Sequence, residues 1–172
     1  PFTAYEAGER VGGQWVLGNT SGTSVAYRSL QVNTHKAICR YSDFPLPDDA
    51  PGFPGHEEMA EYFEAYAQHF DIMGRIRFGT RVEQATPCEG GGYRLQLAGG
   101  ECVEHDGLVI ASGNLWDPRW PEVPGAFDGD FIHSRDYMDA TDPVVCRGKR
   151  VLMMGLGNTA CELAVELSAA GA

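Results

Sequence analysis

A glycine-rich turn near the end of the 172-residue chain has residue types and spacing that suit phosphate chemistry. It follows an apolar run, precedes a helical pattern, and reads Gly155-Leu156-Gly157-Asn158-Thr159-Ala160. Gly155 permits a tight turn, Gly157 lets the backbone approach a pyrophosphate, and Ala160 allows close packing of helix on strand. The free N–H groups that open a helix also attract phosphate. We expect these residues to bind a dinucleotide; the alternative is a merely tight strand-to-helix turn.

The segments on either side of this turn predict the elements that must position it. Residues 150–154 are an apolar run typical of a buried strand, and Ala160, Leu163, Ala164 and Leu167 recur at helical spacing. Strand, glycine turn and helix open a parallel βαβ unit of an α/β fold. The residue that selects NAD or NADP is expected about 20 residues further on, so these residues do not encode that choice.

A second candidate site lies at the start of the chain. Residues 2–5 form a β-prone run that ends at Glu6, and Gly12 and Gly13 then interrupt regular structure. Dinucleotide folds use an acidic residue at the end of a strand to bind the ribose hydroxyls. Glu6 fits that role, although an ordinary surface glutamate at a strand end is the alternative.

Between these two sites the chain predicts three regions. Residues 16–55 are rich in Gly, Ser, Asn and Pro, and such a long irregular segment usually wraps a ligand or is disordered. From His56 onward, apolar residues at helical spacing predict a helix with one buried face: Met59, Tyr62, Phe63, Tyr66 and Phe70. Residues 75–112 alternate as in a β-meander, residues 108–111 are typical of a strand buried on both faces, and prolines then predict an extended connection.

Composition excludes several classes of protein. The net charge of −11 argues against nucleic acid or an anionic membrane surface as a partner. No apolar run approaches the roughly 20 residues that span a bilayer. The five cysteines form no CxxC pair and the histidines show no ligand spacing, so we expect no metal site. Buried, reduced thiols and a cytoplasmic location are the expectation.

Four motifs follow one another in a fixed order along the chain. They are Glu6-x5-Gly12-Gly13-x-Trp15; Tyr27-Arg-Ser-Leu-Gln-Val-Asn33-Thr with Tyr41-Ser-Asp-Phe-Pro-Leu-Pro; Ala111-Ser112-Gly113 before Pro118; and Phe127-x-Gly129-x3-His133-x3-Tyr137. The last resembles the fingerprint of flavin-containing monooxygenases, and the others are similar to that family's second FAD motif, the tract that follows it, and the linker between its domains. The resemblance covers essentially the whole chain, with Ser112 in place of the linker's usual threonine.

The resemblance implies an α/β fold, a fragment of two nested doubly wound (Rossmann-like) dinucleotide-binding domains with a β-meander. Residues 1–113 correspond to part of the FAD-binding domain, 114–148 to the interdomain linker, and 149–172 to the start of the NADPH-binding domain. The family's first glycine motif is absent from the chain. We therefore expect both ends to be cut and the isolated fragment to be inactive.

The implied activity is that of a flavin monooxygenase with FAD and NADPH as cofactors. NADPH reduces FAD, the reduced flavin and O₂ form a C4a-hydroperoxide, and one oxygen passes to a nitrogen or sulfur nucleophile. The partners are thus a small-molecule substrate and O₂, and a homodimer stays open as the assembly.

The resemblance also assigns site residues. Asn33 corresponds to the active-site asparagine, with a turn-capping asparagine as the alternative. The implied cofactor-binding residues, beside the glycine turn, are Glu6, Gly12, Gly13, Trp15, Ser112, Gly113 and His133. Trp15 supports the flavin or belongs to the core, and His133 carries a proton or links the domains. Phe127 and Tyr137 are expected to be packing residues.

Three other functions remain open. A Baeyer–Villiger monooxygenase shares the flavin chemistry, but its fingerprint ends in tryptophan where this chain has Tyr137. A pyridine nucleotide-disulfide reductase shares the fold but needs a cysteine pair. A non-catalytic nucleotide-binding module is the third alternative.

Overall fold

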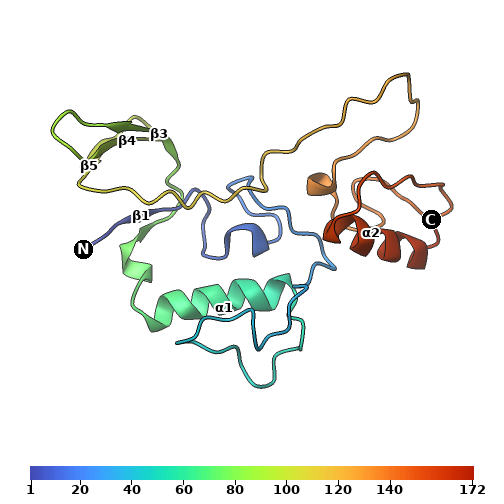
Figure 1. Cartoon of the computed structure of the whole chain (residues 1–172), viewed down its shortest axis with the longest axis horizontal. Helices are drawn as coiled ribbons and strands as arrows, with labels where there is room; N and C mark the ends of the chain where they lie inside the picture. The colour runs from blue at the N-terminus through green and yellow to red at the C-terminus, as the bar shows by residue number, and fades with distance from the viewer.

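The computed structural model describes residues 1–172 as an elongated α/β molecule, with a β-meander at one end, helix α2 at the other and helix α1 between them (Figure 1). The N-terminus lies near the meander and the C-terminus near α2. The elements are β1 (Ala4–Tyr5), η1 (Gly13–Trp15), α1 (His56–His69), η2 (Met73–Arg75), β2 (Ile76–Arg77), β3 (Val82–Pro87), β4 (Tyr93–Leu97), β5 (Cys102–His105), η3 (Ser134–Asp136) and α2 (Asn158–Ala169).

Strands β1 and β2 form a short parallel pair. Ala4 lies opposite Ile76 and Tyr5 opposite Arg77. The pairing continues one residue further, because the Glu6 amide donates to the Arg77 carbonyl at 3.1 Å. Glu6 therefore lies at the end of a parallel strand, as its position after residues 2–5 predicted.

Strands β3, β4 and β5 form the predicted meander, antiparallel and in sequence order. Leu95 and Leu97 are buried on one face of β4. Arg94, on the other face, is exposed and pairs with Glu104 of β5 at 2.8 Å. The alternation of apolar and polar side chains thus determines which face of the sheet is buried.

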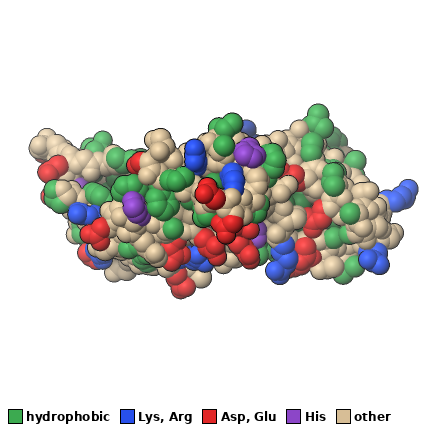
Figure 2. All heavy atoms as spheres, turned by 90° about the horizontal axis from the view of Figure 1, so that it is seen from below, with side chains coloured by type: hydrophobic (Ala, Val, Ile, Leu, Met, Phe, Trp, Pro, Cys, Tyr) green, Lys and Arg blue, Asp and Glu red, His purple; other side chains and the backbone are tan.

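Helix α1 follows the predicted apolar stripe. Met59 and Tyr62 are buried, whereas Phe70, which caps the C-terminus, is partly exposed. At the N-terminus the Glu58 carboxylate accepts a hydrogen bond from the Gly55 amide at 2.9 Å, which satisfies one of the free N–H groups there. Figure 2, which views the molecule from below, shows acidic side chains gathered near the centre of this face, consistent with the net charge of −11.

The irregular segment 16–55 is ordered and packs on α1. Val32 and Leu46 share a core cluster with two residues of α1, Met59 and Tyr62. The Lys36 ammonium donates to the carbonyls of Asp48 and Ala50 at 2.7 and 2.6 Å, which fixes the proline-rich part of the loop. The segment thus packs around a helix of its own chain. The sequence had suggested instead that it wraps a ligand or is disordered.

Two predicted strands do not form. Residues 108–111 and 150–154 belong to no strand, and Val109, Ile110 and Leu152 are 89, 77 and 84% exposed. A parallel strand exists only where a neighbouring strand shares its backbone hydrogen bonds, and no strand of this chain pairs with either run. Helix α2 forms as predicted, with Leu163 and Leu167 buried; Ala164, expected on the same stripe, is exposed.

The expectation of buried thiols is wrong for most of the cysteines. All five are free, but only Cys146 is buried, and Cys102 and Cys161 are exposed. No group of three or more His, Cys, Asp or Glu side chains is arranged to hold a metal ion. None of the helices combines the length and apolar character that crossing a membrane requires.

Candidate functional site

Glu6 presents a half-buried carboxylate at the end of β1. Its Oε1 accepts a hydrogen bond from the Gly8 amide at 2.6 Å, and its other oxygen has no hydrogen-bond partner. A Cβ on Gly8 would lie 2.5 Å from Oδ1 of Asn19, so only glycine lets the chain turn this tightly beside the carboxylate. The arrangement leaves one carboxylate oxygen able to accept hydroxyl donors such as those of a ribose.

Gly12, Gly13 and Trp15 lie where η1 crosses α1. Gly12 has a φ of +126°, and a Cβ on it would lie 2.8 Å from Val16 Cγ2 and 3.4 Å from the Ala60 Cα. Glycine is therefore needed for the close approach of this turn to the helix. Trp15 is partly buried and packs against the core cluster on α1.

Asn33 lies at the surface directly after Val32, which belongs to the core cluster on α1. Its Oδ1 accepts a hydrogen bond from the Thr34 hydroxyl at 3.3 Å, and its amide NH₂ group makes no hydrogen bond. The packing of Val32 fixes the backbone, while the amide remains able to donate to a bound group.

The linker residues Ser112 and Gly113 are exposed, and Gly113 has a φ of +77°. In the fingerprint that follows, a Cβ on Gly129 would lie 2.5 Å from the Phe127 ring, so a larger residue at Gly129 would displace that ring. Phe127 itself is 74% exposed, and its prediction as a packing residue is wrong for this chain. Tyr137, at the other end of the motif, is buried as predicted.

His133 and Arg135 organise the end of the linker. The His133 Nδ1 accepts a hydrogen bond from the Arg135 amide at 3.1 Å, and its ring lies 5.4 Å from that of Trp120. The Arg135 guanidinium donates to the carbonyls of Trp116 and Gly22, the latter at 3.1 Å. Both side chains therefore contact other residues of the linker. Arg135 also ties the linker to the N-terminal segment, through the Gly22 carbonyl.

The glycine turn ends in the N-terminus of α2. Gly155 has a φ of +130°, and Gly157 caps the helix without a side-chain hydrogen bond. The first turn of α2 holds no acidic residue, and no group in the chain accepts from the amides of residues 158–160. These donors and the positive end of the helix dipole suit a phosphate. The turn leads into a helix as predicted, but no sheet strand precedes it.

Five residues join the two halves of the molecule, and nothing in the sequence indicated that they meet: Tyr27 and Tyr137 appeared in motifs, whereas Glu162 and Glu166 were not singled out. The Tyr27 hydroxyl donates to Glu162, the Ser29 hydroxyl to one oxygen of Glu166, and the Tyr137 hydroxyl to the other oxygen of Glu166 at 3.0 Å. We call these five residues the hydroxyl–carboxylate joint. The available signal was that Glu162 and Glu166 are the only charges on α2 and adjoin its buried leucines.

The two tyrosines of the joint are almost fully buried, and both have altered acidity. Burial, and then the hydrogen bond to Glu162, raises the pKa of Tyr27 well above its usual value. Burial, and then the hydrogen bond to Glu166, does the same to the pKa of Tyr137. Both phenols are therefore protonated at neutral pH, where they act as hydrogen-bond donors.

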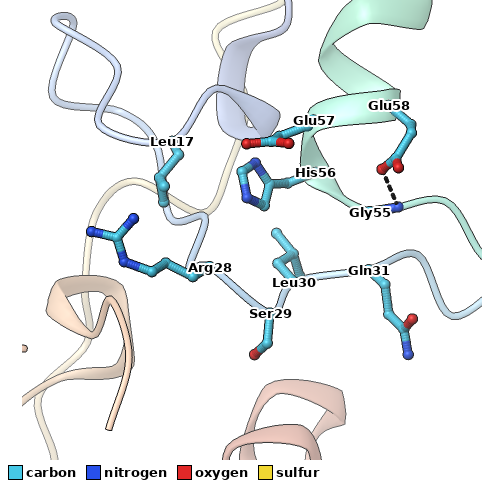
Figure 3. Close-up of a pocket in the computed structure, with 9 residues that line it drawn as sticks. All are labelled: Leu17, Arg28, Ser29, Leu30, Gln31, Gly55, His56, Glu57 and Glu58. Carbon is cyan, nitrogen blue, oxygen red and sulfur yellow. Dashed lines mark hydrogen bonds between the residues drawn. The ribbon is translucent and has the colours of Figure 1, made fainter. Parts of the chain in front are cut away.

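An open hollow of about 320 Å³ lies between residues 28–31 and the start of α1 (Figure 3). Its walls include Arg28, His56 and Glu57, so its surface is mostly polar. Figure 3 shows Ser29 directed away from α1 toward the ribbon of α2, where its hydroxyl meets Glu166.

The predicted site residues fall into three groups. The first group lies on the N-terminal segments near α1 and comprises Glu6, Gly12, Gly13, Trp15 and Asn33. The second lies along the linker and comprises Ser112, Gly113 and His133. The third is the glycine turn at the start of α2. No hydrogen bond or ion pair joins the first group directly to the glycine turn. The joint supplies the contact between these regions.

Comparison with known proteins assigns a family. A family model described as FMO-like, flavin-binding monooxygenase-like, matches residues 1–172. Dimethylaniline monooxygenase (N-oxide-forming) 4 of Rattus norvegicus is 36% identical over 96% of this chain and 31% of its own length. Flavin-containing monooxygenase 1 of Homo sapiens is 34% identical over 96% of this chain and 33% of its own length. The chain thus spans about a third of these relatives.

Solved structures share the fold. S-allyl-L-cysteine S-oxygenase of Allium sativum superposes with a TM-score of 0.86 at 22% identity, over 97% of this chain and 43% of its own. Tmm from Pelagibacter gives 0.85 at 25% identity, over 99% and 42%. Closed cyclohexanone monooxygenase gives 0.70 at 23% identity, over 98% and 31%. With a family model that matches from the first residue to the last, the chain belongs to the flavin-binding monooxygenase-like family.

Proposed function

We propose that this chain forms part of a monooxygenase that uses FAD, NADPH and O₂ to oxygenate nitrogen or sulfur nucleophiles. The observation that carries the proposal is the pair of nucleotide-type features in one chain: the free oxygen of Glu6 after a parallel strand, and the free amides of α2 after a glycine turn. In a single nucleotide fold the acidic residue follows the glycine turn by roughly 20 residues. Here Glu6 precedes the turn at Gly155 by most of the chain, so the two features fit two different folds.

In this proposal residues 1–113 and 149–172 belong to two nested dinucleotide-binding domains, joined by the linker 114–148. Glu6 binds the adenosine ribose of FAD, and Gly12 and Gly13 shape the turn that follows. The amides of residues 158–160 bind a phosphate of NADPH, which suits a helix start without an acidic side chain. When bound, FAD supplies the redox chemistry, since it takes electrons from NADPH and passes them to O₂.

Asn33 has the chemistry of a positioning group at the site of oxygen transfer. Its amide is neutral, and the NH₂ group has no partner in the chain, so it can donate a hydrogen bond without giving up a proton. His133 holds the linker through its contact with the Arg135 amide. Both roles fix geometry, which is part of what the protein contributes in cofactor enzymes.

The substrate class is proposed from the relatives and the fingerprint. The names of the rat relative and the garlic neighbour describe N-oxide formation and S-oxygenation. Tyr137, where the Baeyer–Villiger fingerprint has tryptophan, is buried and uses its hydroxyl to bind Glu166.

The experiment uses the full-length protein that carries this chain. We expect it to purify with FAD, and to oxidise NADPH with O₂ uptake and N-oxide or S-oxide formation from tertiary amines and sulfides. Lactone formation from cyclic ketones, with no amine or sulfide oxygenated, would replace the proposal by Baeyer–Villiger chemistry. NADP⁺ binding without any O₂ uptake would indicate a non-catalytic module.

A matched pair of variants tests the FAD role of Glu6. Glu6→Gln removes the negative charge that attracts ribose hydroxyls, and Glu9→Gln makes the same change at an exposed position three residues later. We expect FAD affinity to fall on the order of tenfold in the first variant only, the loss of one charge-assisted hydrogen bond. Equal FAD affinity in both variants would remove Glu6 from the site.

A further inference from the structure

The contact between residues 27–30 and α2 is more directional than apolar packing alone. Beneath it, Tyr27 and Tyr137 share a core cluster with Leu163 and Leu167, and the two phenol rings meet edge to face at 6.2 Å. Above this apolar layer, three hydroxyls converge on two carboxylates one helical turn apart. Hydrogen bonds of this kind fix the rotation of a helix about its own axis, which non-directional burial does not.

Glu162 and Glu166 have no evident purpose within α2 itself. They are its only charged residues, they repel each other at i,i+4 spacing, and neither forms an ion pair. Both also lie beyond the first turn of the helix, where acidic residues interact most favourably with the dipole. All of their hydrogen bonds from side chains come from residues outside the helix.

The joint connects the glycine turn to the segment that carries Asn33. On one side, α2 begins at the turn, so its orientation decides where the amides of residues 158–160 point. On the other side, the Leu30 carbonyl accepts from the His56 amide at 2.9 Å, and Gln31 pairs with Gly55, which anchors this segment to the start of α1. A continuous set of contacts therefore runs from α1 through residues 27–31 to α2.

We propose that Glu162 and Glu166 are positioning residues, which hold the nucleotide-binding turn of α2 in fixed orientation toward the Asn33 segment. The inference rests on the proposed function and deepens it: the joint aligns bound NADPH with the flavin for hydride transfer. Neither glutamate touches a cofactor; each acts through the helix whose N-terminus binds the phosphate. Because a misplacement of about 1 Å can lower a rate on the order of a hundredfold, small rotations of α2 matter.

The test compares variants of the full-length protein loaded with FAD. Glu166→Ala removes both acceptors, Glu166→Gln keeps one acceptor oxygen, and Tyr137→Phe removes a single hydroxyl while it keeps the buried ring. Glu61→Ala, on the exposed face of α1, is the matched control. FAD content, melting temperature, the Kd for NADP⁺, the anaerobic rate of flavin reduction at saturating NADPH, and hydrogen exchange of residues 27–30 and 158–163 are measured for each.

We expect Glu166→Ala to slow flavin reduction on the order of tenfold to a hundredfold and to speed hydrogen exchange in both segments, with FAD content kept. The reduction and exchange rates of Glu166→Gln and Tyr137→Phe should lie between those of Glu166→Ala and the control. Combined in one protein, these two substitutions should have less than the sum of their separate effects, because both break the same contact. The control should match the wild type in every measurement.

Two results would overturn the inference. One is flavin reduction and hydrogen exchange at wild-type rates in both Glu166→Ala and Tyr137→Phe. The other is a slower reduction that appears only together with lost FAD and a lower melting temperature in all three joint variants, which indicates a structural role alone. A wild type that NADPH does not reduce at all would instead overturn the proposed function, and the inference with it.

Discussion

At the scale of single residues, the Tyr62 hydroxyl shows how an irregular loop is held to a helix. It accepts from the Tyr41 amide at 2.8 Å and donates to the Phe44 carbonyl at 2.6 Å, while the ring is buried in the core cluster of α1. Backbone groups that have no partner in a strand or helix are thus satisfied by one side chain.

Tyr62→Phe should lower the free energy of unfolding by about 1–2 kcal/mol, because two backbone groups lose their partner while the buried ring stays. Urea denaturation of the full-length protein measures the change, with Tyr93→Phe as the control, since the exposed Tyr93 hydroxyl makes no hydrogen bond. Equal stability of the two variants would mean that water replaces the Tyr62 hydroxyl at no cost.

The raised pKa of Tyr27 predicts a loss of stability at high pH. Burial and the facing Glu162, Glu166 and Tyr137 keep this phenol protonated in the folded state. The unfolded chain releases the proton at its ordinary pKa of about 10, so the stabilising contribution is complete below that pH and declines above it. Denaturation curves from pH 8 to pH 11 should show a smaller alkaline decline in Tyr27→Phe than in the wild type; parallel declines would contradict the prediction.

Residue-scale contacts were the hardest to predict from the sequence. The positions of Glu6 at the end of a strand and of the glycine turn at the start of a helix were predictable, because both follow from local sequence pattern. The joint was not, because its partners Tyr27 and Glu162 are 135 positions apart and only the folded chain brings them together. The motifs that contain Tyr27 and Tyr137 mark these tyrosines, but nothing in them indicates that the hydroxyls bind carboxylates of α2.

At the scale of elements, the crossing of η1 and α1 depends on Gly12 more than on Gly13. Gly12→Ala meets both an unfavourable φ of +126° and contacts with Val16 and Ala60, so we expect a cost of about 2–3 kcal/mol. Gly13→Ala, with a φ of +52° and no atom within 4 Å, should cost about 1 kcal/mol. Urea denaturation of the protein stripped of FAD measures both; a larger cost at Gly13 would show that contact with α1 is not what selects glycine.

Elements with local signals formed where the sequence predicted them. The apolar stripe of α1 and the alternation in β4 depend on side chains a few residues apart, and both elements appear. The runs at 108–111 and 150–154 needed neighbouring strands, and the sequence pattern of an apolar run gives no information on whether such neighbours are present. An apolar run therefore does not by itself identify a strand, and the strand predictions at 108–111 and 150–154 were wrong for this chain.

At the scale of the whole molecule, the exposed apolar runs predict how the 172-residue chain behaves by itself. Val109, Ile110 and Leu152 are among its most exposed large side chains. We expect the isolated chain to bind a hydrophobic dye such as ANS, to self-associate and to retain no FAD. Ile110→Lys should reduce dye binding more than Ile38→Lys, which changes an equally exposed but isolated residue. A monomeric, yellow preparation of residues 1–172 would contradict this prediction.

The linker has one further consequence for the molecule. Between residues 111 and 132 every position except Pro118 is exposed, and no helix or strand protects the backbone. A protease would cut here first, yet the two pieces would stay together, because the Arg28–Asp139 ion pair, the Arg135–Gly22 hydrogen bond and the buried tyrosines do not depend on the peptide bond that was cut. The two parts of this protein are thus held together by non-covalent contacts as well as by the peptide chain of the linker.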